Sequence, residues 1–405
     1  MMMEQNKKVP AIRFKGFEKK WTLKKLETLA NFYRGKEHSW KHIEKKGNYK
    51  CILYGNLYSN YGMIISEVLY KTNIKTDNTF WGVKNDVLIP SSDTTPFGLA
   101  RASSLDIDEV ILGGDINVIR PHDVNGNYLS LNLNSNKKKL LSLIKGSTVR
   151  HLDNSDIKKI ELYISDTISE QTQIGDFFKT IDAQITLHKQ KHQKLLNLKS
   201  AMLEKMFPKE GANVPEIRFE GFTEKWEEKK LGDFGVVSMN KRIFKNETSI
   251  KGEIPFFKIG TFGGKPDAYI SREKFLEYKT KYPYPKKGDI LISASGSIGR
   301  LVIYDGKEEY FQDSNIVWLK HNGSLVNKFL KQFYLIIKWN GLEGSTIKRL
   351  YNSNILSSKI KVPCKKEQQK IGAYFENLDN LISQSKTQIH KYKSIKQALL
   401  QKMFV

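Results

Sequence analysis

Histidines spaced four residues apart are the first residues in the sequence whose types and spacing could support chemistry. His38 and His42 form one such pair, and His188 and His192 form another. Two such side chains can meet a metal ion on one helix face, but neither pair has the intervening Glu of an HExxH motif or a nearby third ligand. We therefore expect no metal site. His188 and His192 fall in a long helical pattern, where polar residues that set the register are the better interpretation.

A glycine-rich stretch, GTFGGKP at 260–266, matches a phosphate-binding loop only in part. Such a loop needs Gly, four residues and then Gly-Lys-Ser/Thr, so that backbone amides surround the phosphate and the hydroxyl reaches magnesium. This stretch is one residue short and has Pro266 where the hydroxyl belongs. No NPPY-like tetrapeptide or FxGxG strand end is present either, which disfavours a chain that methylates adenine by itself. We expect no catalytic residue and no cofactor bound by this chain.

The charge balance points to a polyanionic partner. The 405 residues include 67 Lys and Arg against 43 Asp and Glu, a formal net charge of +24, and 39% are hydrophobic. This hydrophobic content is that of a folded protein, and the excess positive charge favours nucleic acid ahead of an anionic membrane surface. The length favours two or more domains.

Cysteine usage and hydropathy limit the class of protein further. Cys51 and Cys364 are the only cysteines and stand in no CxxC or Cys/His ligand spacing, so a disulfide framework or a zinc finger is excluded in practice. The longest apolar runs fall far short of the ~18 residues that a membrane helix needs. We expect a cytoplasmic protein.

Three stretches place basic or amide side chains beside aromatic residues or glycines, at 32–41, 238–245 and 293–300. Arg can donate two hydrogen bonds to guanine, Asn can pair with adenine in the same way, and Lys mainly meets phosphate. A solvated surface charge is the alternative for each residue taken singly. Arg300, in a turn after a predicted strand, is the preferred base-reading residue. The candidate DNA-binding residues are Arg34, Lys36, Trp40, Lys41, Asn240, Lys241, Arg242, Ser295, Ser297 and Arg300.

An internal repeat organises the chain. VPAIRFKGFEKKWTLKKL at 9–26 returns as VPEIRFEGFTEKWEEKKL at 214–231, with twelve of eighteen aligned positions identical. We call these stretches the opening motifs. GSTVRHLDNSDI at 146–157 likewise returns as GSTIKRLYNSNI at 344–355. Chance does not produce such matches in the same order, so the chain contains two consecutive copies of one plan.

Each copy ends in a segment that we expect to be a long helix. EQTQIGDFF at 170–178 matches EQQKIGAYF at 367–375, and each segment closes with Met-Phe. The apolar residues that follow recur at spacings of three and four, which favours an intramolecular coiled coil of helices of about 36–38 residues over two separate core helices. The expected helix-pairing residues are Ile174, Phe178, Ile181, Ile185, Leu195, Met202, Ile371, Phe375, Leu378, Ile382, Ile389 and Leu399.

The pairing must be antiparallel if the two globular copies are to lie at opposite ends of the coil. We place Ile174 opposite Met403. This register sets Ile185 against Tyr392 and His192 against Ser385, so it predicts specific contacts between the helices.

The block between each opening motif and its helix is rich in short runs typical of strands, such as DVLIPSS at 86–92. Asp86 aligns with Asp289 and Asn117 with Asn315, whereas most loop residues differ. A common scaffold with different loops is typical of recognition. The expected fold class is α+β, with two mixed α/β domains separated by two long helices that form an antiparallel coiled coil, and with an internal two-fold repeat.

With these motifs in order and duplicated, the sequence resembles the DNA specificity (S) subunit of Type I restriction-modification enzymes over essentially its whole length. The resemblance is carried by PxIRFxGFxxxW in the opening motifs, the GST segments, the EQxxIG helix starts and the LxKMF ending at Leu203 to Phe207. One departure is that Pro363, usual in the family before the second helix, is replaced near Ser165 in the first copy. The resemblance implies target recognition domains at 1–165 and 210–362, and conserved long helices at 166–209 and 363–405.

The resemblance also implies a function. Each target recognition domain would read one half of a bipartite site in double-stranded DNA. The paired helices would act as a ruler and as the docking surface for two modification subunits, which bind S-adenosylmethionine and methylate adenine. Restriction subunits that use ATP and magnesium would join this core, and the present chain would itself be non-catalytic. A free-standing two-headed DNA-binding regulator, and a nuclease or methylase with unrecognised motifs, are the alternatives.

Overall fold

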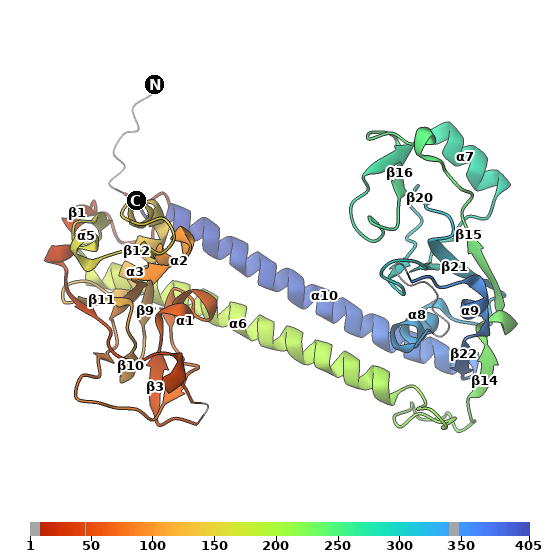
Figure 1. Cartoon of the computed structure of the whole chain (residues 1–405), viewed down its shortest axis with the longest axis horizontal. Coiled ribbons are helices and arrows are strands. Elements are labelled where there is room, and N and C mark those ends of the chain that lie inside the picture. Colours follow the sequence, from red (N-terminus) through yellow and green to blue (C-terminus); the bar gives the residue numbers. More distant parts are fainter. Residues whose placement is uncertain (1–8, 45, 340–347) are drawn as a thin grey trace. The chain divides into compact units, whose positions relative to one another are not determined.

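The computed structural model describes residues 9–44, 46–339 and 348–405. The chain forms two compact units, which we describe separately: unit 1 comprises Met1–Lys189 with Thr387–Val405, and unit 2 comprises Gln190–Lys386. Two long helices, α6 (Ile168–Lys205) and α10 (Lys365–Lys402), contribute to both units (Figure 1). We call the part of each unit outside these helices head 1 and head 2. Within the described residues, no helix is both long and apolar enough to cross a membrane.

Head 1 contains a five-stranded sheet in the order β2-β11-β7-β9-β4 and a four-stranded sheet in the order β5-β3-β10-β6, with the two-stranded pairs β1-β13 and β12-β8. Its strands are β1 (Thr22–Lys25), β2 (Ala30–Arg34), β3 (Tyr49–Ile52), β4 (Ile64–Ile65), β5 (Lys71–Thr72), β6 (Trp81–Gly82), β7 (Val87–Pro90), β8 (Ser92–Asp93), β9 (Ser103–Leu105), β10 (Val110–Leu112), β11 (Ile116–Pro121), β12 (Arg150–His151) and β13 (Glu161–Ile164). Its helices are η1 (Leu26–Thr28), η2 (Trp40–His42), α1 (Tyr54–Ser59), α2 (Pro96–Leu99), α3 (Gly126–Ser135), α4 (Lys137–Leu141) and α5 (Asn154–Ile157).

Head 2 repeats this plan, with fewer strands among its described residues, in a four-stranded sheet β15-β21-β18-β19, a three-stranded sheet β17-β16-β20 and the pair β14-β22. Its strands are β14 (Glu227–Lys230), β15 (Gly235–Met239), β16 (Ile254–Phe257), β17 (Ala268–Ile270), β18 (Ile290–Ser293), β19 (Leu301–Ile303), β20 (Tyr310–Phe311), β21 (Ile316–His321) and β22 (Lys359–Val362). Its helices are η3 (Leu231–Asp233), η4 (Lys245–Glu247), α7 (Arg272–Lys281), α8 (Asn327–Ile336) and α9 (Asn352–Ser357). The predicted α+β class and the internal repeat are confirmed.

The aligned aspartates explain part of the shared scaffold. Asp86 accepts a hydrogen bond from the Val83 amide at 3.0 Å, and Asp289 accepts one from the Lys286 amide at 2.8 Å. Each carboxylate therefore closes the turn that leads into a buried central strand, β7 or β18. The same residue is retained in both copies because the same turn has to be closed.

The opening motif is fastened to the start of a long helix by an ion pair in each unit. Arg13 donates two hydrogen bonds to Glu170, at 2.6 and 2.8 Å, and Arg218 donates two to Glu367, at 2.7 and 2.8 Å. Both glutamates are fully buried, and these hydrogen bonds raise the pKa of each guanidinium. A buried carboxylate that lost its bidentate partner would be strongly destabilising, so Arg and Glu must be retained together.

The rest of the EQxxIG pattern has an equally direct explanation. The side-chain oxygen of Gln171 accepts a hydrogen bond from the Asn125 amide just before α3, and Gln368 accepts one from the Val326 amide just before α8. At Gly372, an added Cβ would lie 2.7 Å from the Cβ of Lys328 on α8. Glutamine therefore caps the head helix, and glycine allows that helix to pack closely against α10.

The two Met-Phe endings pack into the core of the unit in which the other long helix begins. Phe404, at the end of α10, lies 5.5 Å from Tyr128 and 6.4 Å from Phe178 of α6, in unit 1. In unit 2, a second set of rings follows the same plan. Phe207, at the end of α6, lies against Trp226, Phe329 and Phe375 at centroid distances of 5.9, 5.4 and 6.4 Å.

The long helices pair antiparallel within each unit. In unit 1, Lys396 donates two hydrogen bonds to Asp182, at 2.6 and 2.7 Å, and His188 stacks on Tyr392 at 5.3 Å. In unit 2, Nδ1 of His192 lies 2.8 Å from Oγ of Ser385. Because the Ser385 hydroxyl already donates to the carbonyl of Ile382, the histidine nitrogen must be the donor. The predicted contact between His192 and Ser385 is confirmed.

The expected helix-pairing residues differ in burial according to their position along the long helices. Those near the helix starts are buried in the cores of the units, where they pack against the heads as well as the facing helix. Those farther along the helices are only partly buried. The buried set is Ile174, Phe178, Ile181, Ile185, Ile371, Phe375 and Leu378, and the partly buried set is Leu195, Met202, Ile382, Ile389 and Leu399.

Cysteine cross-linking tests the register. In a chain without Cys51 and Cys364, cysteines at positions 185 and 392 should form an intramolecular link on oxidation or with a short bis-maleimide, because the antiparallel register sets these positions opposite each other. Cysteines at positions 174 and 371, at the two helix starts, are the matched control, since only a parallel pairing would bring them together. Efficient linking of the control pair instead would contradict the register.

Low pH should weaken the pairing in unit 2. Burial alone would raise the pKa of Asp379, but hydrogen bonds from Lys199 and Lys331, at 2.6 and 2.7 Å, outweigh burial and leave this pKa below its usual value. The pairing energy is therefore present above the unfolded pKa of about 3.9 and is lost as the pH falls through the folded pKa. Asp379→Asn should cost about 1 kcal/mol near pH 7 and progressively less below pH 4.

The measurement is the melting temperature of both proteins from pH 7 to pH 3. Asp176→Asn, which changes an exposed aspartate of α6, is the matched control and should show no such convergence. A difference between wild type and Asp379→Asn that stays constant with pH would contradict the role of this carboxylate.

Candidate nucleic-acid interface

The predicted DNA-binding residues of both heads lie around one end of the main sheet. Arg34 is the last residue of β2, which pairs with β11, and Asn240 follows β15, which pairs with β21. The two strand pairs occupy equivalent positions in the two sheets. The segments before β11 and β21 are therefore the places to look for partners of these side chains.

In head 1, Arg34 is held by an aspartate far away in the sequence. Its Nη2 donates to Oδ1 of Asp115 and to Oγ of Ser91, both at 2.9 Å. Asp115 lies just before β11 with a φ of 61°, a left-handed conformation that aspartate tolerates better than most residues. The side chain of Arg34 is 51% exposed, so its orientation is fixed while its donors remain accessible.

In head 2, Arg242 forms a similar pair, three residues beyond Met239, which is the position that corresponds to Arg34 in the strand register. Nε of Arg242 donates to Oδ2 of Asp313 at 2.7 Å, and the side chain of Arg242 is 58% exposed. Ser314, which follows this aspartate and precedes β21, has a left-handed φ of 51°. Each head therefore presents one oriented arginine at the same end of its sheet, which suits bidentate hydrogen bonding to a guanine edge or a phosphate.

Two predicted DNA-binding residues are buried. Ser295 is 6% exposed and donates to Oδ1 of Asn315 at 2.6 Å, so it supports the loop that also carries Asp313. Asn240 is 2% exposed. We correct the expectation that these side chains are presented on the surface, because local packing turns them inward where the sequence pattern indicated an open loop.

Arg300 is exposed and anchored through one nitrogen. Its Nη1 donates to the carbonyl of Phe262 at 2.8 Å, and its amide donates to Oγ of Ser293 at the same distance. Ser297, in the same turn, is exposed. Phe262 belongs to the GTFGGKP stretch, which forms a turn that supports this arginine. A role for Arg300 in base reading stays a prediction.

The other predicted residues of head 1 gather near η2. Lys36 and Lys41 are exposed, and Trp40 is 53% exposed with its ring edge-on to Tyr70 at 5.4 Å. An exposed indole beside lysines can stack on a base or pack against the sugar-phosphate backbone. Gly35 permits this arrangement, because a Cβ there would lie 2.1 Å from the carbonyl oxygen of Gly113.

The nearby histidine pair has a structural role. His38 is buried, with Nε2 3.0 Å from the carbonyl of Ile74, and His42 accepts the Ser39 amide at 3.3 Å. No group of three or more His, Cys, Asp or Glu side chains arranged to hold a metal occurs among the described residues.

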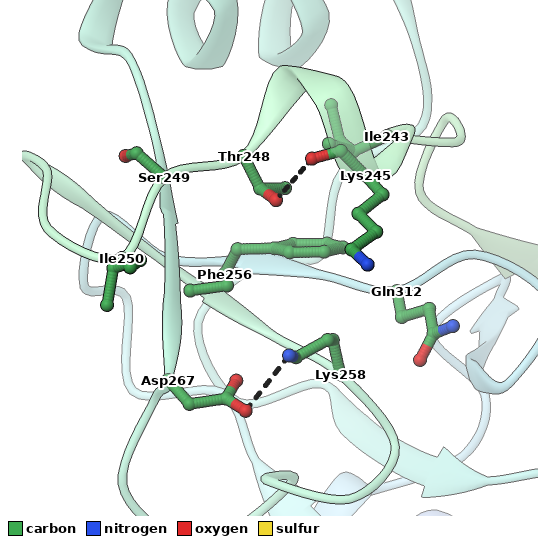
Figure 2. A pocket seen from close by; sticks show the side chains of 10 residues that line it. Ile243, Lys245, Thr248, Ser249, Ile250, Phe256, Lys258, Asp267 and Gln312 are labelled. Atoms are coloured by element: carbon green, nitrogen blue, oxygen red, sulfur yellow. Dashed lines mark hydrogen bonds and ion pairs between the residues drawn. The ribbon is translucent and has the colours of Figure 1, made fainter.

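A pocket of about 440 Å³ continues from the arginine loop of head 2. Figure 2 shows the ring of Phe256 in its middle, with Lys245 and the amide of Gln312 beside it. Lys258 pairs with Asp267 across the pocket at 2.9 Å. An apolar floor with cations at the rim can hold a flat ring or a sugar next to a phosphate. Lys241 lies outside the pocket, with Nζ 5.1 Å from the centroid of the Tyr282 ring.

Sequence reasoning missed the partners that orient the arginines. Asp115 is separated from Arg34 by 81 positions and Asp313 from Arg242 by 71, so no local pattern connects them. The expected alignment of Asn117 with Asn315 was wrong by two residues: Ile116 pairs with Pro90 and Ile316 with Ser293, so Asn315 corresponds to Asp115.

Comparison with known proteins gives the family. The profile of the Type I restriction modification DNA specificity domain matches residues 18–197 and 223–391. A putative Type I restriction enzyme specificity subunit of Haemophilus influenzae is 60% identical over 159 residues, which cover 38% of this chain and 41% of that relative. A putative Type I specificity subunit of Mycoplasma genitalium is 21% identical over 400 residues, covering 95% of this chain and 94% of the relative.

Solved structures agree on the fold. The crystal structure of a Type I restriction-modification S subunit from M. genitalium superposes with a TM-score of 0.65 at 17% identity, covering 98% of this chain and 99% of the other. A chain from a structural study of complex assembly in the Type I R-M system superposes with a TM-score of 0.53 at 15% identity, covering 95% and 97%.

Proposed function

Because this chain belongs to the Type I restriction-modification DNA specificity family, we propose that it supplies sequence specificity to a multisubunit restriction-modification enzyme. Head 1 reads one half of a bipartite site in double-stranded DNA and head 2 reads the other. The chain is non-catalytic and works in the cytoplasm, where its partners carry out the reactions.

One observation carries the proposal: both heads orient an exposed arginine with an aspartate at the same end of the same sheet. What surrounds each arginine differs. Arg34 has Trp40 and Lys36 nearby in sequence, whereas Arg242 leads into the pocket of Figure 2. Arginines at the same end of the same sheet but with different neighbours are expected for two readers that bind DNA alike and recognise different bases.

The docking surfaces for partners should instead be alike in the two units. In unit 1, Phe14 of the opening motif packs edge-on against Phe177 at 5.5 Å, beside the half-buried Phe17. In unit 2, Phe219 packs against Tyr374 at 6.2 Å, and the half-buried ring of Phe222 lies 5.1 Å from Nζ of Lys370 on α10. Partly exposed aromatic residues retained in both copies indicate a shared partner. We assign these two surfaces, at the starts of α6 and α10, to two modification subunits.

The reactions then belong to the partners. The modification subunits bind S-adenosylmethionine and methylate adenine, and restriction subunits that use ATP and magnesium join the assembled core. The present chain binds none of these cofactors and contributes the choice of site together with the helical spacer.

A free-standing two-headed regulator is the rival function. It would bind its site tightly without any modification subunit, and it gives no reason for partly exposed aromatic residues to be kept in both opening motifs. An independent nuclease or methylase would act on DNA alone with a metal ion or S-adenosylmethionine. Both rivals are tested by assaying the isolated chain.

Removing the oriented arginines should alter the two half-sites separately. Arg34→Ala should relax one base position in the first half-site, and Arg242→Ala should relax one in the second. A lost bidentate contact costs about 1–3 kcal/mol, or roughly 5–150-fold in affinity for the preferred base. The measurement is competition binding by the assembled methyltransferase against a series of single-base variants.

Lys137→Ala and Lys251→Ala, which remove exposed lysines from head 1 and head 2, are the matched controls. If a variant binds every DNA sequence more weakly by the same factor, the arginine binds phosphate. If both affinity and selectivity are unchanged, the arginine is a solvated surface charge. Arg300→Ala, measured in the same way, tests the remaining sequence prediction.

Removing one aromatic side chain from each docking surface should change the stoichiometry. Phe17→Ser or Phe222→Ser alone should leave a complex with one modification subunit, and the double variant should bind none, because apolar area is lost from one or both surfaces. Native mass spectrometry gives the count. Ile250→Ser, at a side chain that is 85% exposed on head 2, is the control. Two modification subunits on the double variant would contradict this assignment.

A further inference from the structure

The main sheets of the two heads differ at one edge. In head 1, the short strand β4 adds parallel to β9, with Ile64 opposite Ser104 and Ile65 opposite Leu105. Among the described residues of head 2, β19 is the last strand of its sheet. Matching backbone hydrogen bonds identify the equivalent residues, since Leu105 donates to the carbonyl of Asp86 at 2.8 Å and Tyr304 donates to that of Asp289 at 2.9 Å.

The added strand of head 1 is held by several donors. The carbonyl of Met63 accepts the Ser104 amide at 2.9 Å and the hydroxyls of Ser104 and Ser130 at 3.2 and 2.7 Å. The carbonyl of Ile65 accepts the Asp106 amide at 2.9 Å. An extended segment of the chain is thereby fixed between the edge of β9 and helix α3.

The equivalent place in head 2 is a groove. By these hydrogen bonds, Ile303 replaces Ser104 and Asp305 replaces Asp106. The glutamine contacts to the Asn125 and Val326 amides align α3 with α8, so Lys331 replaces Ser130. All three line a cavity of about 490 Å³ between β19, α8 and the start of α10. Ile303 is 47% exposed, and its amide faces away from β18, because Tyr304 and Val302 are the residues that bond to that strand.

A buried polar atom in this groove also lacks a partner. Gln332 on α8 is 1% exposed and lines the cavity, and its side-chain oxygen has no hydrogen bond within the described residues. The equivalent residue of head 1 is Leu131, which is fully buried. An unsatisfied buried acceptor costs about 1–3 kcal/mol. The presence of Gln332 where head 1 has a leucine is therefore explained if another molecule places a hydrogen-bond donor in the groove.

We propose that this groove binds an extended segment of a modification subunit, which adds to β19 as a parallel strand. A carbonyl of that segment accepts the Ile303 amide, as the Met63 carbonyl accepts the Ser104 amide in head 1. A branched aliphatic side chain of the segment fills the cavity, as expected from the Met-Ile-Ile sequence of residues 63–65. This inference rests on the proposed function only for the identity of the partner.

The groove and the docking surface of unit 2 lie on the same stretch of α10. Gly372 and Glu376, which line the cavity, stand two residues before and two residues after Tyr374, so they point to the other side of the helix at the same level. A subunit bound at Tyr374 could therefore place a segment in the groove by passing a few residues around α10. Since head 1 already holds its own strand at this place, only one of the two modification subunits would donate a segment.

Amide hydrogen exchange resolved by residue provides the first test. In the isolated full chain, the amides of Ser104 and Asp106 should be protected and those of Ile303 and Asp305 should exchange freely. Binding of the modification subunit should slow exchange at Ile303 and Asp305 at least tenfold and leave Ser104 and Asp106 unchanged. Free exchange at Ile303 in an assembled complex would overturn the proposal.

A synthetic peptide tests the groove independently of any partner. The probe is an acetylated, amidated and fluorescently labelled peptide of residues 61–67 (YGMIISE), titrated to millimolar concentration on the full chain. Ile303→Pro removes the outward amide at an edge strand, where proline is tolerated, and Ile303→Val retains the amide while shortening the side chain. The peptide should bind wild type and Ile303→Val alike and Ile303→Pro at least tenfold more weakly.

The two arms separate the possible failures. If no complex forms with a modification subunit, the proposed function fails while the peptide arm still decides whether the groove accepts a strand. Equal peptide binding to the Pro and Val variants, or no binding to wild type, would overturn strand addition. Peptide binding without amide protection in the complex would overturn the modification subunit as the occupant.

Discussion

The bidentate pairs between the opening motifs and the buried glutamates are the constraint on which the rest of the structure depends. Glu170 and Glu367 are fully buried at the starts of α6 and α10, and each needs a guanidinium to be tolerated there. Since each arginine comes from an opening motif, each head is locked to the start of its own long helix. The Met-Phe ending of the other helix then packs into the same core. Each unit therefore combines the head and helix start of one copy with the helix end of the other copy.

This closure explains which residues the two copies share. Residues that fasten a head to a helix are identical or nearly so, because one geometry is built twice: Arg, Glu and Gln at the helix start, Trp in the opening motif and Phe at the helix end. Residues at the exposed end of each sheet are not needed to fasten a head to a helix, and at these positions the two copies differ. The internal repeat therefore separates positions that hold the fold from positions that are free to recognise different sequences.

Much of the fold could be predicted from the sequence because its determinants are local or repeated. Apolar spacing of three and four predicted both long helices. Placing the two globular copies at opposite ends of the coil predicted an antiparallel register, which the contact between His192 and Ser385 confirms. The candidate site was predicted less well. Asn240 and Ser295 turn inward, and the aspartates that orient Arg34 and Arg242 lie 81 and 71 positions away. Such pairings arise from the order of strands in a sheet, which composition and spacing do not encode. The sequence also did not predict that β19 ends its sheet among the described residues of head 2, for the same reason.

The central claim is that one chain reads two different half-sites with two heads of common design. Sequencing of methylated adenines across a genome that carries this gene with its modification partner tests it most directly. The account predicts one non-palindromic, bipartite motif with a spacer of fixed length, lost when the gene is deleted. A continuous or palindromic motif, or a methylation pattern unchanged by the deletion, would contradict it.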